Sequence, residues 1–288
     1  MTDSHDDTHR ARTPPAQALS RAVGLADWED DRLVGLMDAI APGADARERP
    51  HRKTWEFAMG ALALEEAGLL DDERSTGLSV GAGHESVLYY LTGRCGRLVA
   101  TDLYGEGDFA RGEAGAMMLT DPDLFAPYPY ERDRLEARHM NALDLAFDDC
   151  SFDFVVSFGS IEHFGGLEAA ARALAETGRV LRPGGVAVVT TELATDGAGD
   201  DPIPGLQLFA PETIETLVAD EPLLDWLGEA ELTPSDDGAP LIDLHEEVER
   251  VEAGDQSYPH IRLSVRGTDG RPREFSSVSL ALTRPEAR

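Results

Sequence analysis

The sequence predicts an α/β fold with a doubly wound, mostly parallel β-sheet. Through the middle of the chain, short apolar runs alternate with stretches in which apolar residues recur at helical spacing. Some runs, such as VAVVT at residues 186–190, are almost continuously apolar, which suits strands buried on both faces. Such strands, linked by helices, are typical of a parallel sheet that is covered by helices on both sides.

Five strands and three helices make up the alternating part of the chain. Two later strand-like runs, residues 260–265 and 276–282, are separated by the turn-rich RGTDGRPRE and by no helix. They predict an antiparallel hairpin at an edge of the sheet. The alternating strands are expected at residues 77–80, 98–101, 135–139, 154–158 and 186–191, and the helices between them at 84–91, 112–119 and 167–181.

The chain before the first strand divides into a tail and a cap. Residues 1–20 are polar, contain two adjacent prolines and show no periodicity, so we expect a mobile tail. Residues 28–40 and 54–69 each place apolar residues on one helical face, which predicts two helices in a cap spanning residues 21–74. The main domain then covers residues 75–288.

Two stretches are too long to be plain connections between a helix and a strand. They are residues 104–134 and residues 196–257, the second rich in Asp, Glu, Gly and Pro. Long insertions beside strand ends are often lids or binding loops, and some are only decoration. We expect residues 196–257 to form a lid.

Composition limits the partners and the compartment. The chain has 25 Lys and Arg against 55 Asp and Glu, a formal charge of −30. Nucleic acids and anionic membranes are disfavoured partners, because both are negatively charged. Cys95 and Cys150 are too few for a disulfide framework, which indicates a reducing compartment. The sequence has no apolar run of roughly 20 residues and no signal-like start, so we expect a cytoplasmic protein.

The basic residues are almost all arginine, and Lys53 is the only lysine. A strongly acidic, lysine-poor surface fits adaptation to high salt, because salt screens the repulsion between like charges. A biased genome combined with an ordinary acidic surface explains the same composition. Both explanations concern solubility and partners rather than the reaction.

A glycine turn follows the first strand of the main domain. In GLSVGAGHESVLYYL, residues 77–91, a buried strand runs into Gly81 and Gly83 and then into a helix. The glycines allow a sharp turn and a close approach by a ligand, and the helix start offers unpaired N–H groups to an anion. A purely structural turn is the alternative. Ser86 stands where the dinucleotide fingerprint has its third glycine, which disfavours a nicotinamide dinucleotide.

Asp102 ends the next strand, about twenty residues after the glycine turn, in RLVATDLYG. A carboxylate at this place can accept hydrogen bonds from both hydroxyls of a ribose. A strand-end aspartate is also a common helix cap. Together with the glycine turn, Asp102 favours a ligand that contains adenosine.

Two further segments narrow the choice of cofactor. They are RHMNALDLAFDDCSFDFVVSFGSIEHFGG at residues 138–166 and GRVLRPGGVAVVTTEL at residues 178–193. With the glycine turn and Asp102, they resemble the motifs of class I S-adenosylmethionine-dependent methyltransferases. The resemblance covers about residues 52–193 and extends to the terminal strand pair. It implies a seven-stranded Rossmann-like sheet, S-adenosylmethionine as the cofactor, and no metal site.

The resemblance assigns one set of residues to the ribose side of the cofactor. It implies that Gly81, Ala82 and Gly83 line the methionine and ribose portion. It further implies that Asp102 holds the ribose hydroxyls and that Leu103 lies against the adenine.

The same resemblance assigns a second set to the adenine and the sulfonium. Asn141 stands where relatives usually carry an aspartate facing the adenine amino group, and its side-chain oxygen can accept the same hydrogen bond. Ala142 would offer its backbone N–H to the ring. Ser157 and Phe158 would border the sulfonium end.

The chain departs from the family pattern at two positions. Ser79 replaces an acidic residue that is common in the first strand, and Glu85 stands where many relatives have a glycine. The serine weakens the usual anchoring of the methionine ammonium group. A carboxylate from elsewhere can substitute, and Glu56 in HRKTWEF and Glu162 are the candidates.

The acceptor side is defined by fewer residues. His163 follows the strand that ends beside the expected sulfonium, and histidine titrates near neutral pH, so it is the candidate general base with Glu162 beside it. The alternative is that Glu162 and His163 simply fix this loop and its neighbouring helix. The HRKTWEF segment either completes the cofactor pocket or packs as plain structure.

These residues predict methyl transfer from S-adenosylmethionine to a hydroxyl or amine of a small molecule, such as a sugar or a specialised metabolite. A protein or peptide methyltransferase is the first alternative, because an acidic surface attracts a basic partner. A non-catalytic, cofactor-binding scaffold is the second. Nucleotide-dependent oxidoreduction is disfavoured by the missing third glycine and by the RPGG turn.

Overall fold

The computed structural model describes residues 18–107, 109, 111–235 and 237–286. Most of the expected tail therefore lies outside the described residues. Ser20–Ala22 form strand β1, which joins the main sheet between β13 and β10, and Ser20 is fully buried. The tail therefore ends before residue 20, and the chain enters the sheet where we expected a helical cap to begin.

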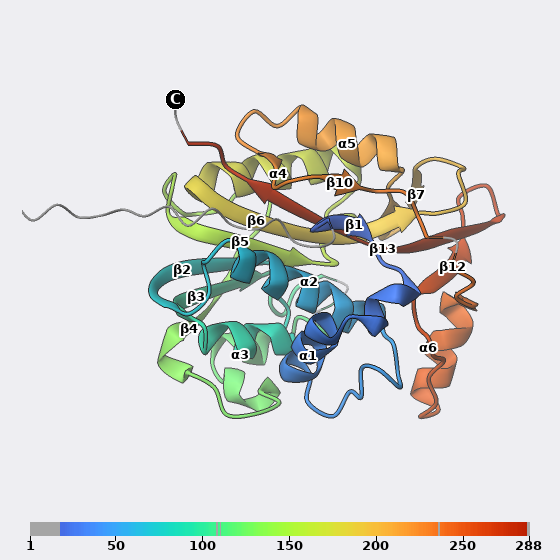
Figure 1. The fold of residues 1–288 in the computed structure, drawn as a ribbon, viewed down its shortest axis with the longest axis horizontal. Coiled ribbons are helices and arrows are strands. Elements are labelled where there is room, and N and C mark those ends of the chain that lie inside the picture. The colour runs from blue at the N-terminus through green and yellow to red at the C-terminus, as the bar shows by residue number, and fades with distance from the viewer. Residues whose placement is uncertain (1–17, 108, 110, 236, 287–288) are drawn as a thin grey trace, which may run out of the picture.

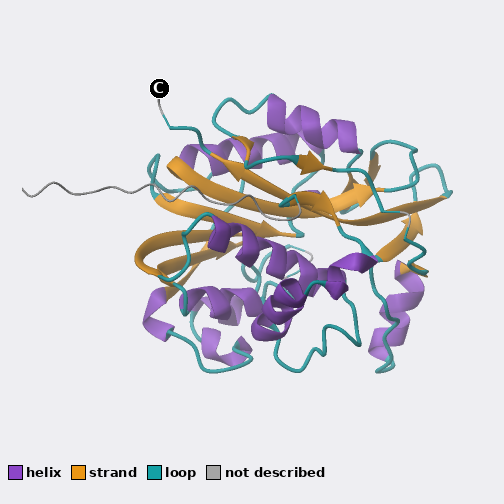
Figure 2. Ribbon diagram, in the orientation of Figure 1, coloured by secondary structure: helices purple, strands orange, loops and turns teal. Residues whose placement is uncertain are grey.

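Five parallel strands form one side of the sheet, in the order β6, β5, β2, β3, β4, with β4 at the edge (Figures 1 and 2). Chain order reverses between β2 and β5, which creates a topological switch point at the carboxyl ends of these strands. All five were predicted, and several are longer than expected. Their bounds are Asp72–Val80 for β2, Cys95–Asp102 for β3, Leu135–His139 for β4, Phe152–Phe158 for β5 and Leu181–Ala194 for β6.

The expected antiparallel pair is present as β12, Arg262–Arg266, and β13, Pro272–Thr283. Its position is corrected, because β13 lies inside the sheet between β6 and β1. The physical reason is that residues 275–282 are buried without interruption, which an edge strand would not be.

Within the described residues, the sheet has 11 strands rather than the expected seven. The five parallel strands, β12 and β13 account for seven, and four short strands extend them. A separate hairpin pairs β7 with β8. The short strands are β1, β9 at Asp225–Trp226, β10 at Ala230–Glu231 and β11 at Leu241–Asp243, and the hairpin comprises β7 at Asp201–Ile203 and β8 at Leu206–Leu208.

Helices cover both faces of the sheet, as a doubly wound fold requires (Figure 2). One face carries α1, Asp31–Ile40, with α2, Arg52–Glu66, and α3, Ser86–Thr92. The other carries α4, Leu167–Val180, and α5, Pro211–Ala219. Because α2 packs directly on β13, β6 and β5, the N-terminal helices are a layer of the main domain rather than a separate cap.

The remaining helical segments are short. The helix expected at residues 112–119 is corrected to a single 3-10 turn at its end, because Gly112 and Gly115 disfavour an α-helix. Helix α6, Leu244–Glu252, packs on β11 and β12. The 3-10 turns are η1 at Leu25–Glu29, η2 at Ala116–Leu119, η3 at Pro122–Phe125, η4 at Arg132–Arg134 and η5 at Ile161–His163.

The expected lid at residues 196–257 is also corrected. Helix α5 buries Ile214 and Val218 in the core beside α4, and β9, β10 and β11 all belong to the sheet. The segment therefore contributes to the main domain, because α5 packs into its core, although Leu241, Val248 and Val251 of this segment stay exposed. Within this segment, the β7–β8 hairpin contacts the site described below, through Gly205 and His163.

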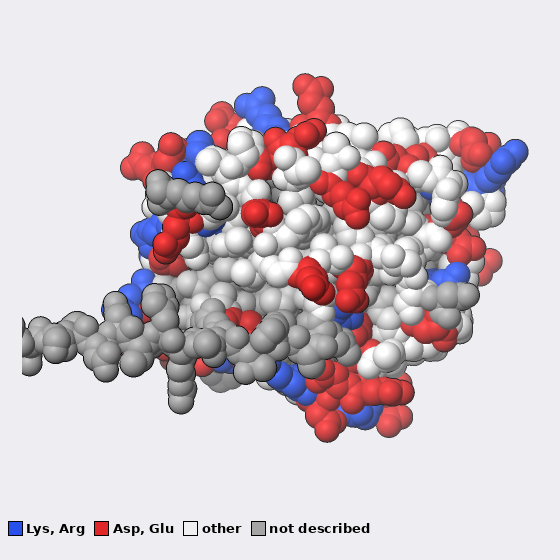
Figure 3. All heavy atoms as spheres, turned by 45° about the horizontal axis from the view of Figure 1, so that its top comes forward, with Lys and Arg blue, Asp and Glu red and all other residues white. Residues whose placement is uncertain are grey.

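Among the described residues, no helix has the length and apolar character that crossing a membrane requires. On the face shown in Figure 3, acidic side chains lie in several groups, with basic side chains beside some of them. The described Lys and Arg side chains do not gather into a basic patch on this face.

Candidate active site

A cavity of about 550 Å³ lies at the carboxyl ends of the parallel strands. This volume is typical of sites for small molecules, and the switch point is where open α/β sheets bind ligands. The cavity runs across the strand ends from β3 and β4 toward β6. Of the residues expected at the site, nine line it: Gly81, Gly83, Asp102, Leu103, Asn141, Ala142, Phe158, Glu162 and His163.

Four other expected site residues lie behind the cavity wall. Ser79 and Ala82 are each 1% exposed, and Ser157 is buried in β5 with no hydrogen-bond partner for its hydroxyl. Glu56 is also 1% exposed and meets the cavity through the basic side chains described below. These residues shape or support the wall rather than forming its surface.

The glycine turn is enforced by the protein's own packing. Gly81 has φ +62°, and a Cβ there would lie 2.6 Å from the Ser160 Cβ. Gly83 has φ +47°, and its Cβ would lie 2.6 Å from the Glu113 carbonyl oxygen. Any larger residue at either position would have to displace the opposite wall, so both glycines keep the backbone open to the cavity.

Asp102 is held by the backbone at the end of β3. Its Oδ2 accepts a hydrogen bond from the Gly83 N–H at 2.9 Å, and its Oδ1 accepts one from the Leu103 N–H at 2.7 Å. Burial raises the pKa of Asp102 above its ordinary value, although these two bonds oppose the rise. Each carboxylate oxygen keeps a second lone pair for a hydroxyl donor. We call the part of the cavity around Asp102, Leu103, Asn141 and Ala142 the Asp102 end.

Asn141 contributes to the same end from the loop after β4. Its side-chain oxygen accepts a hydrogen bond from the Leu143 N–H at 2.9 Å, which fixes the side chain in an Asx turn. The oxygen keeps one lone pair, and the amide nitrogen remains a donor. Asn141 can therefore offer both an acceptor and a donor to a ring in the cavity.

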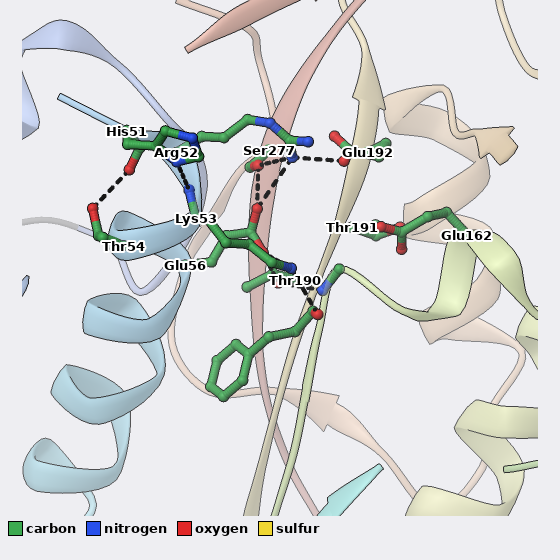
Figure 4. Close-up of polar contacts among 12 residues, drawn as sticks. His51, Arg52, Lys53, Thr54, Glu56, Glu162, Thr190, Thr191, Glu192 and Ser277 are labelled. Carbon is green, nitrogen blue, oxygen red and sulfur yellow. Dashed lines mark hydrogen bonds and ion pairs between the residues drawn. The ribbon is translucent and has the colours of Figure 1, made fainter. Parts of the chain in front are cut away.

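The opposite part of the cavity, which we call the charged end, is built around Glu56 (Figure 4). Glu56 Oε1 accepts from Arg52 at 3.2 Å and from the Ser277 hydroxyl at 2.6 Å. Its Oε2 accepts from Lys53 at 3.2 Å and from the Thr190 hydroxyl at 2.9 Å. Burial alone would raise the pKa of Glu56, but Lys53 and Arg52 hold it below its ordinary value. Glu56 is therefore charged and fully occupied by its four partners.

Lys53 links Glu56 to the cavity surface. Its Nζ donates to the Phe158 carbonyl oxygen at 3.0 Å and lies 3.3 Å from Glu85 Oε1. With Glu56, this gives three acceptors for the three ammonium donors. Gly159 has φ +56°, and a Cβ there would come within 2.4 Å of the Lys53 Nζ, so the glycine makes room for the ammonium group. Desolvation would lower the pKa of Lys53, but Glu56 and Glu85 raise it.

Two other carboxylates of the charged end have raised pKa values. Burial raises the pKa of Glu85 to about 7, although Lys53 opposes the rise. Burial and the nearby Glu192 raise the pKa of Glu162 to about 8. Glu162 Oε2 accepts from the Thr191 hydroxyl at 2.9 Å. These groups therefore exchange protons near neutral pH.

His163 is oriented by the β7–β8 hairpin. Its Nδ1 lies 2.6 Å from the Gly205 carbonyl oxygen. A carbonyl only accepts, so Nδ1 carries the proton and the Nε2 lone pair is left free. Nε2 lies 3.9 Å from Glu162 Oε1, and the side chain is 28% exposed at the cavity. This orientation suits a proton acceptor.

Sequence reasoning missed Glu192, which lines the charged end from β6 and accepts from Arg52 at 2.6 Å. Glu192 is the single charged residue that closes the apolar run VAVVTTEL, and a charge at a strand end was a usable signal. Lys53 belongs to the HRKTWEF segment, for which the sequence left a cofactor pocket and plain packing as alternatives. The contacts of Lys53 and Arg52 support the interpretation that HRKTWEF completes the pocket.

Comparison with known proteins agrees with this geometry. Residues 78–189 match a family described as methyltransferase domain. The chain carries a methyltransferase domain. A stretch of 118 residues is 40% identical to a probable S-adenosylmethionine-dependent methyltransferase of Mycolicibacterium smegmatis, covering 38% of this chain and 43% of that relative. The chain therefore matches less than half of the relative's length.

Solved structures confirm the Rossmann-like fold, and the match extends over most of this chain. The (4+2)-cyclase SpnF has a TM-score of 0.53 at 17% identity, with 91% of this chain and 94% of that chain covered. A candidate sarcosine dimethylglycine methyltransferase from Galdieria sulphuraria has a TM-score of 0.53 at 16% identity, with 89% and 99% covered. Since one of these proteins is a cyclase, the fold alone does not determine the reaction.

Proposed function

We propose that the protein binds S-adenosylmethionine in this cavity and transfers its methyl group to a hydroxyl or amine of a small molecule. The observation that carries the proposal is Asp102, whose oxygens each keep a free lone pair opposite the glycine turn at the switch point. The match of residues 78–189 to a methyltransferase domain supports it.

The residues of the cavity fit the cofactor. Asp102 would hold the ribose hydroxyls, and Leu103, Asn141 and Ala142 would contact the adenine. Gly81 and Gly83 would pass along the ribose and methionine portion, with Ala82 and Ser79 supporting the turn. Phe158, backed by Ser157, would border the sulfonium. The bound cofactor supplies a methyl group on a positively charged sulfur, and the carboxylates of the cavity match that charge.

The methionine ammonium group needs a carboxylate partner. Position 79, where relatives often carry an acidic residue, is a serine in this chain, so another residue must supply the carboxylate. Glu56 has no lone pair to spare, because its four partners belong to the protein. Glu85 lines the cavity next to the glycine turn, and among the described residues its carboxylate is ion-paired with Lys53 alone. We assign the ammonium group to Glu85 rather than to Glu56 or Glu162.

The chain's own contribution to transfer is positioning and proton removal. The cavity holds the acceptor in line with the sulfonium and limits water. His163 Nε2 would take the acceptor's proton, since Nδ1 is committed to the Gly205 carbonyl. Glu162, beside it, would stabilise the protonated imidazole.

Calorimetry tests the cofactor assignment directly. Saturable binding of S-adenosylmethionine and S-adenosylhomocysteine is expected, and NAD serves as the matched negative ligand. A failure of both ligands to bind at millimolar concentration, in low and in high salt, would overturn the proposal.

The role of His163 has its own test. His163→Ala should keep cofactor affinity but lose roughly 10²–10⁴ in turnover, measured with methyl-labelled cofactor. The loss should shrink as pH rises, because the acceptor then loses its proton without help. Full activity in His163→Ala would show that positioning alone suffices, and loss of cofactor binding would indicate a structural role.

A further inference from the structure

One buried carboxylate oxygen at the charged end has no partner. Glu192 is 4% exposed and lines the cavity from the end of β6. Its Oε1 accepts from Arg52, but its Oε2 is buried without any hydrogen-bond donor among the described residues. Leaving a charged oxygen without a donor in the interior is costly, so buried carboxylates are normally satisfied. This oxygen is left without a donor by the described residues, and the Arg52 Nε, also buried, makes no hydrogen bond with them either.

Glu162 faces the same part of the cavity from η5 and is 2% exposed. Thr191 satisfies its Oε2, while its Oε1 has His163 Nε2 at 3.9 Å, beyond hydrogen-bonding distance. Glu192 and Glu162 are close enough that the charge of Glu192 raises the pKa of Glu162. A cation between these two groups would relieve their repulsion and lower the raised pKa of Glu162, so that Glu162 becomes ionised when the cation binds.

The protein does not supply that cation. The charged end holds four carboxyl groups, and Arg52 and Lys53 are the only Arg or Lys among the described residues that line the cavity. The rings of His51 and His260 stack nearby at 4.2 Å. Burial lowers the pKa of His51 to about 3 and that of His260 to about 4, so both are neutral at pH 7. The carboxylates of the charged end therefore outnumber its cations whenever Glu162 and Glu85 are ionised.

We infer that Glu162 and Glu192 bind the ammonium group of the acceptor, so that the substrate is an amine with an apolar body. This rests on the proposed function and narrows its acceptor from a hydroxyl or amine to an amine. A hydroxyl can donate to Glu192 Oε2, but it does not balance the charge. Phe109, Phe158 and Phe164 line the same cavity and offer apolar faces, which also attract cations.

The transfer step balances with residues already described. The bound ammonium loses one proton to His163 Nε2, which leaves a lone pair on nitrogen. That lone pair forms the new N–C bond as the C–S bond of the donor breaks, and the electron pair of the C–S bond stays on sulfur. Glu162 and Glu192 hold the nitrogen in place before proton loss and hold the methylated ammonium product after it is reprotonated.

The test uses calorimetry on the full chain saturated with S-adenosylhomocysteine at pH 7. The probes are 2-phenylethylamine and its neutral counterpart 2-phenylethanol, which have the same apolar body. Charge-assisted hydrogen bonds predict that the amine binds about tenfold more tightly or better. Glu192→Gln should abolish this preference while S-adenosylhomocysteine affinity changes less than twofold. Glu215→Gln removes the same charge from an exposed position on α5 and should keep the preference.

Three results would overturn the inference. They are equal binding of amine and alcohol to the wild-type protein, retention of the preference in Glu192→Gln, and weaker S-adenosylhomocysteine binding in Glu192→Gln with the amine unaffected. The last would assign Glu192 to the cofactor. If Glu192→Gln does not fold, Glu162→Gln serves in its place and should reduce the same preference. Titrating the amine without S-adenosylhomocysteine separates the two proposals, because loss of cofactor binding with intact amine selectivity contradicts only the proposed function.

Discussion

The two ends of the cavity are built in different ways. At the Asp102 end, the main polar contacts are made by the backbone, since Gly83 and Leu103 donate to Asp102 and Leu143 donates to Asn141. At the charged end, side chains from α2, β6, β13 and η5 satisfy one another (Figure 4). Local chain geometry thus fixes the Asp102 end, whereas long-range charge pairing holds the charged end. Changes at the charged end should consequently affect folding more than changes at the Asp102 end.

The largest effect is expected at Glu56. Glu56→Ala leaves Arg52 and Lys53 without their shared carboxylate, which should lower the free energy of unfolding by about 3 kcal/mol. Urea denaturation measures the change. Glu66→Ala is the matched control, because Glu66 lies on the same helix in an ion pair with the exposed Arg32, and its loss should cost less than about 1 kcal/mol. Equal losses in the two variants would contradict the contrast between the ends.

Asp102→Asn should produce the opposite pattern, with binding impaired and folding nearly intact. Replacing one acceptor oxygen by an amide removes a charge-assisted hydrogen bond, worth roughly 1.5–3 kcal/mol, so cofactor affinity should fall at least tenfold. Calorimetry measures the affinity, and the melting temperature serves as the internal control. An unchanged dissociation constant would mean that the ribose is held elsewhere.

The pH dependence of the free energy of unfolding tests the charged end at Glu162. This residue is surrounded by Glu192, Lys53, Glu56 and His163. Its pKa of about 8 in the folded protein exceeds the ordinary value of 4.5, so the folded state keeps a proton that the unfolded chain loses. The free energy of unfolding should therefore fall as pH rises from about 4.5 to about 8, by at most about 1.4 kcal/mol per pH unit.

Glu162→Gln removes this group and should make the slope shallower, most clearly between pH 7 and 8, as measured by urea denaturation at pH 5, 6, 7 and 8. Glu85, whose pKa is about 7, contributes a slope of the same sign below pH 7 in both proteins. Glu215→Gln, which changes the same charge on exposed α5, should keep the slope of the wild-type protein. A wild-type slope in Glu162→Gln would show that other groups are responsible.

The smallest effect is expected at Gly159. Gly159→Ala places a methyl group 2.4 Å from the Lys53 Nζ and forces alanine to φ +56°. The unfavourable backbone conformation alone should lower the free energy of unfolding by about 1 kcal/mol, and displacement of the Lys53 ammonium should lower it further. Gly107→Ala is the control, since Gly107 has φ +74° with open space around it. Equal destabilisation of the two variants would show that the Lys53 contact contributes little.

The same contrast explains what the sequence could predict. The strand, the glycine turn and Asp102 lie within about 25 residues of one another, so spacing alone places them together. The link between Glu56 and Ser277 spans 221 residues, and no periodicity reports it. The lid was predicted wrongly for a related reason, because composition does not show that Ile214 and Val218 are consumed by packing against the sheet.

The single lysine gives the protein a built-in chemical reporter. Apart from the chain's amino terminus, Lys53 carries its one alkyl amine. The Lys53 side chain is two-thirds covered, and its amine is ion-paired at the cavity. Because its pKa is raised, the amine is protonated and a poor nucleophile in the folded state. An amine-reactive reagent should therefore modify Lys53 slowly until the charged end opens. Because the chain has one lysine, a mass increase at Lys53 identifies the modified position directly. The rate of that increase then measures how often the charged end opens.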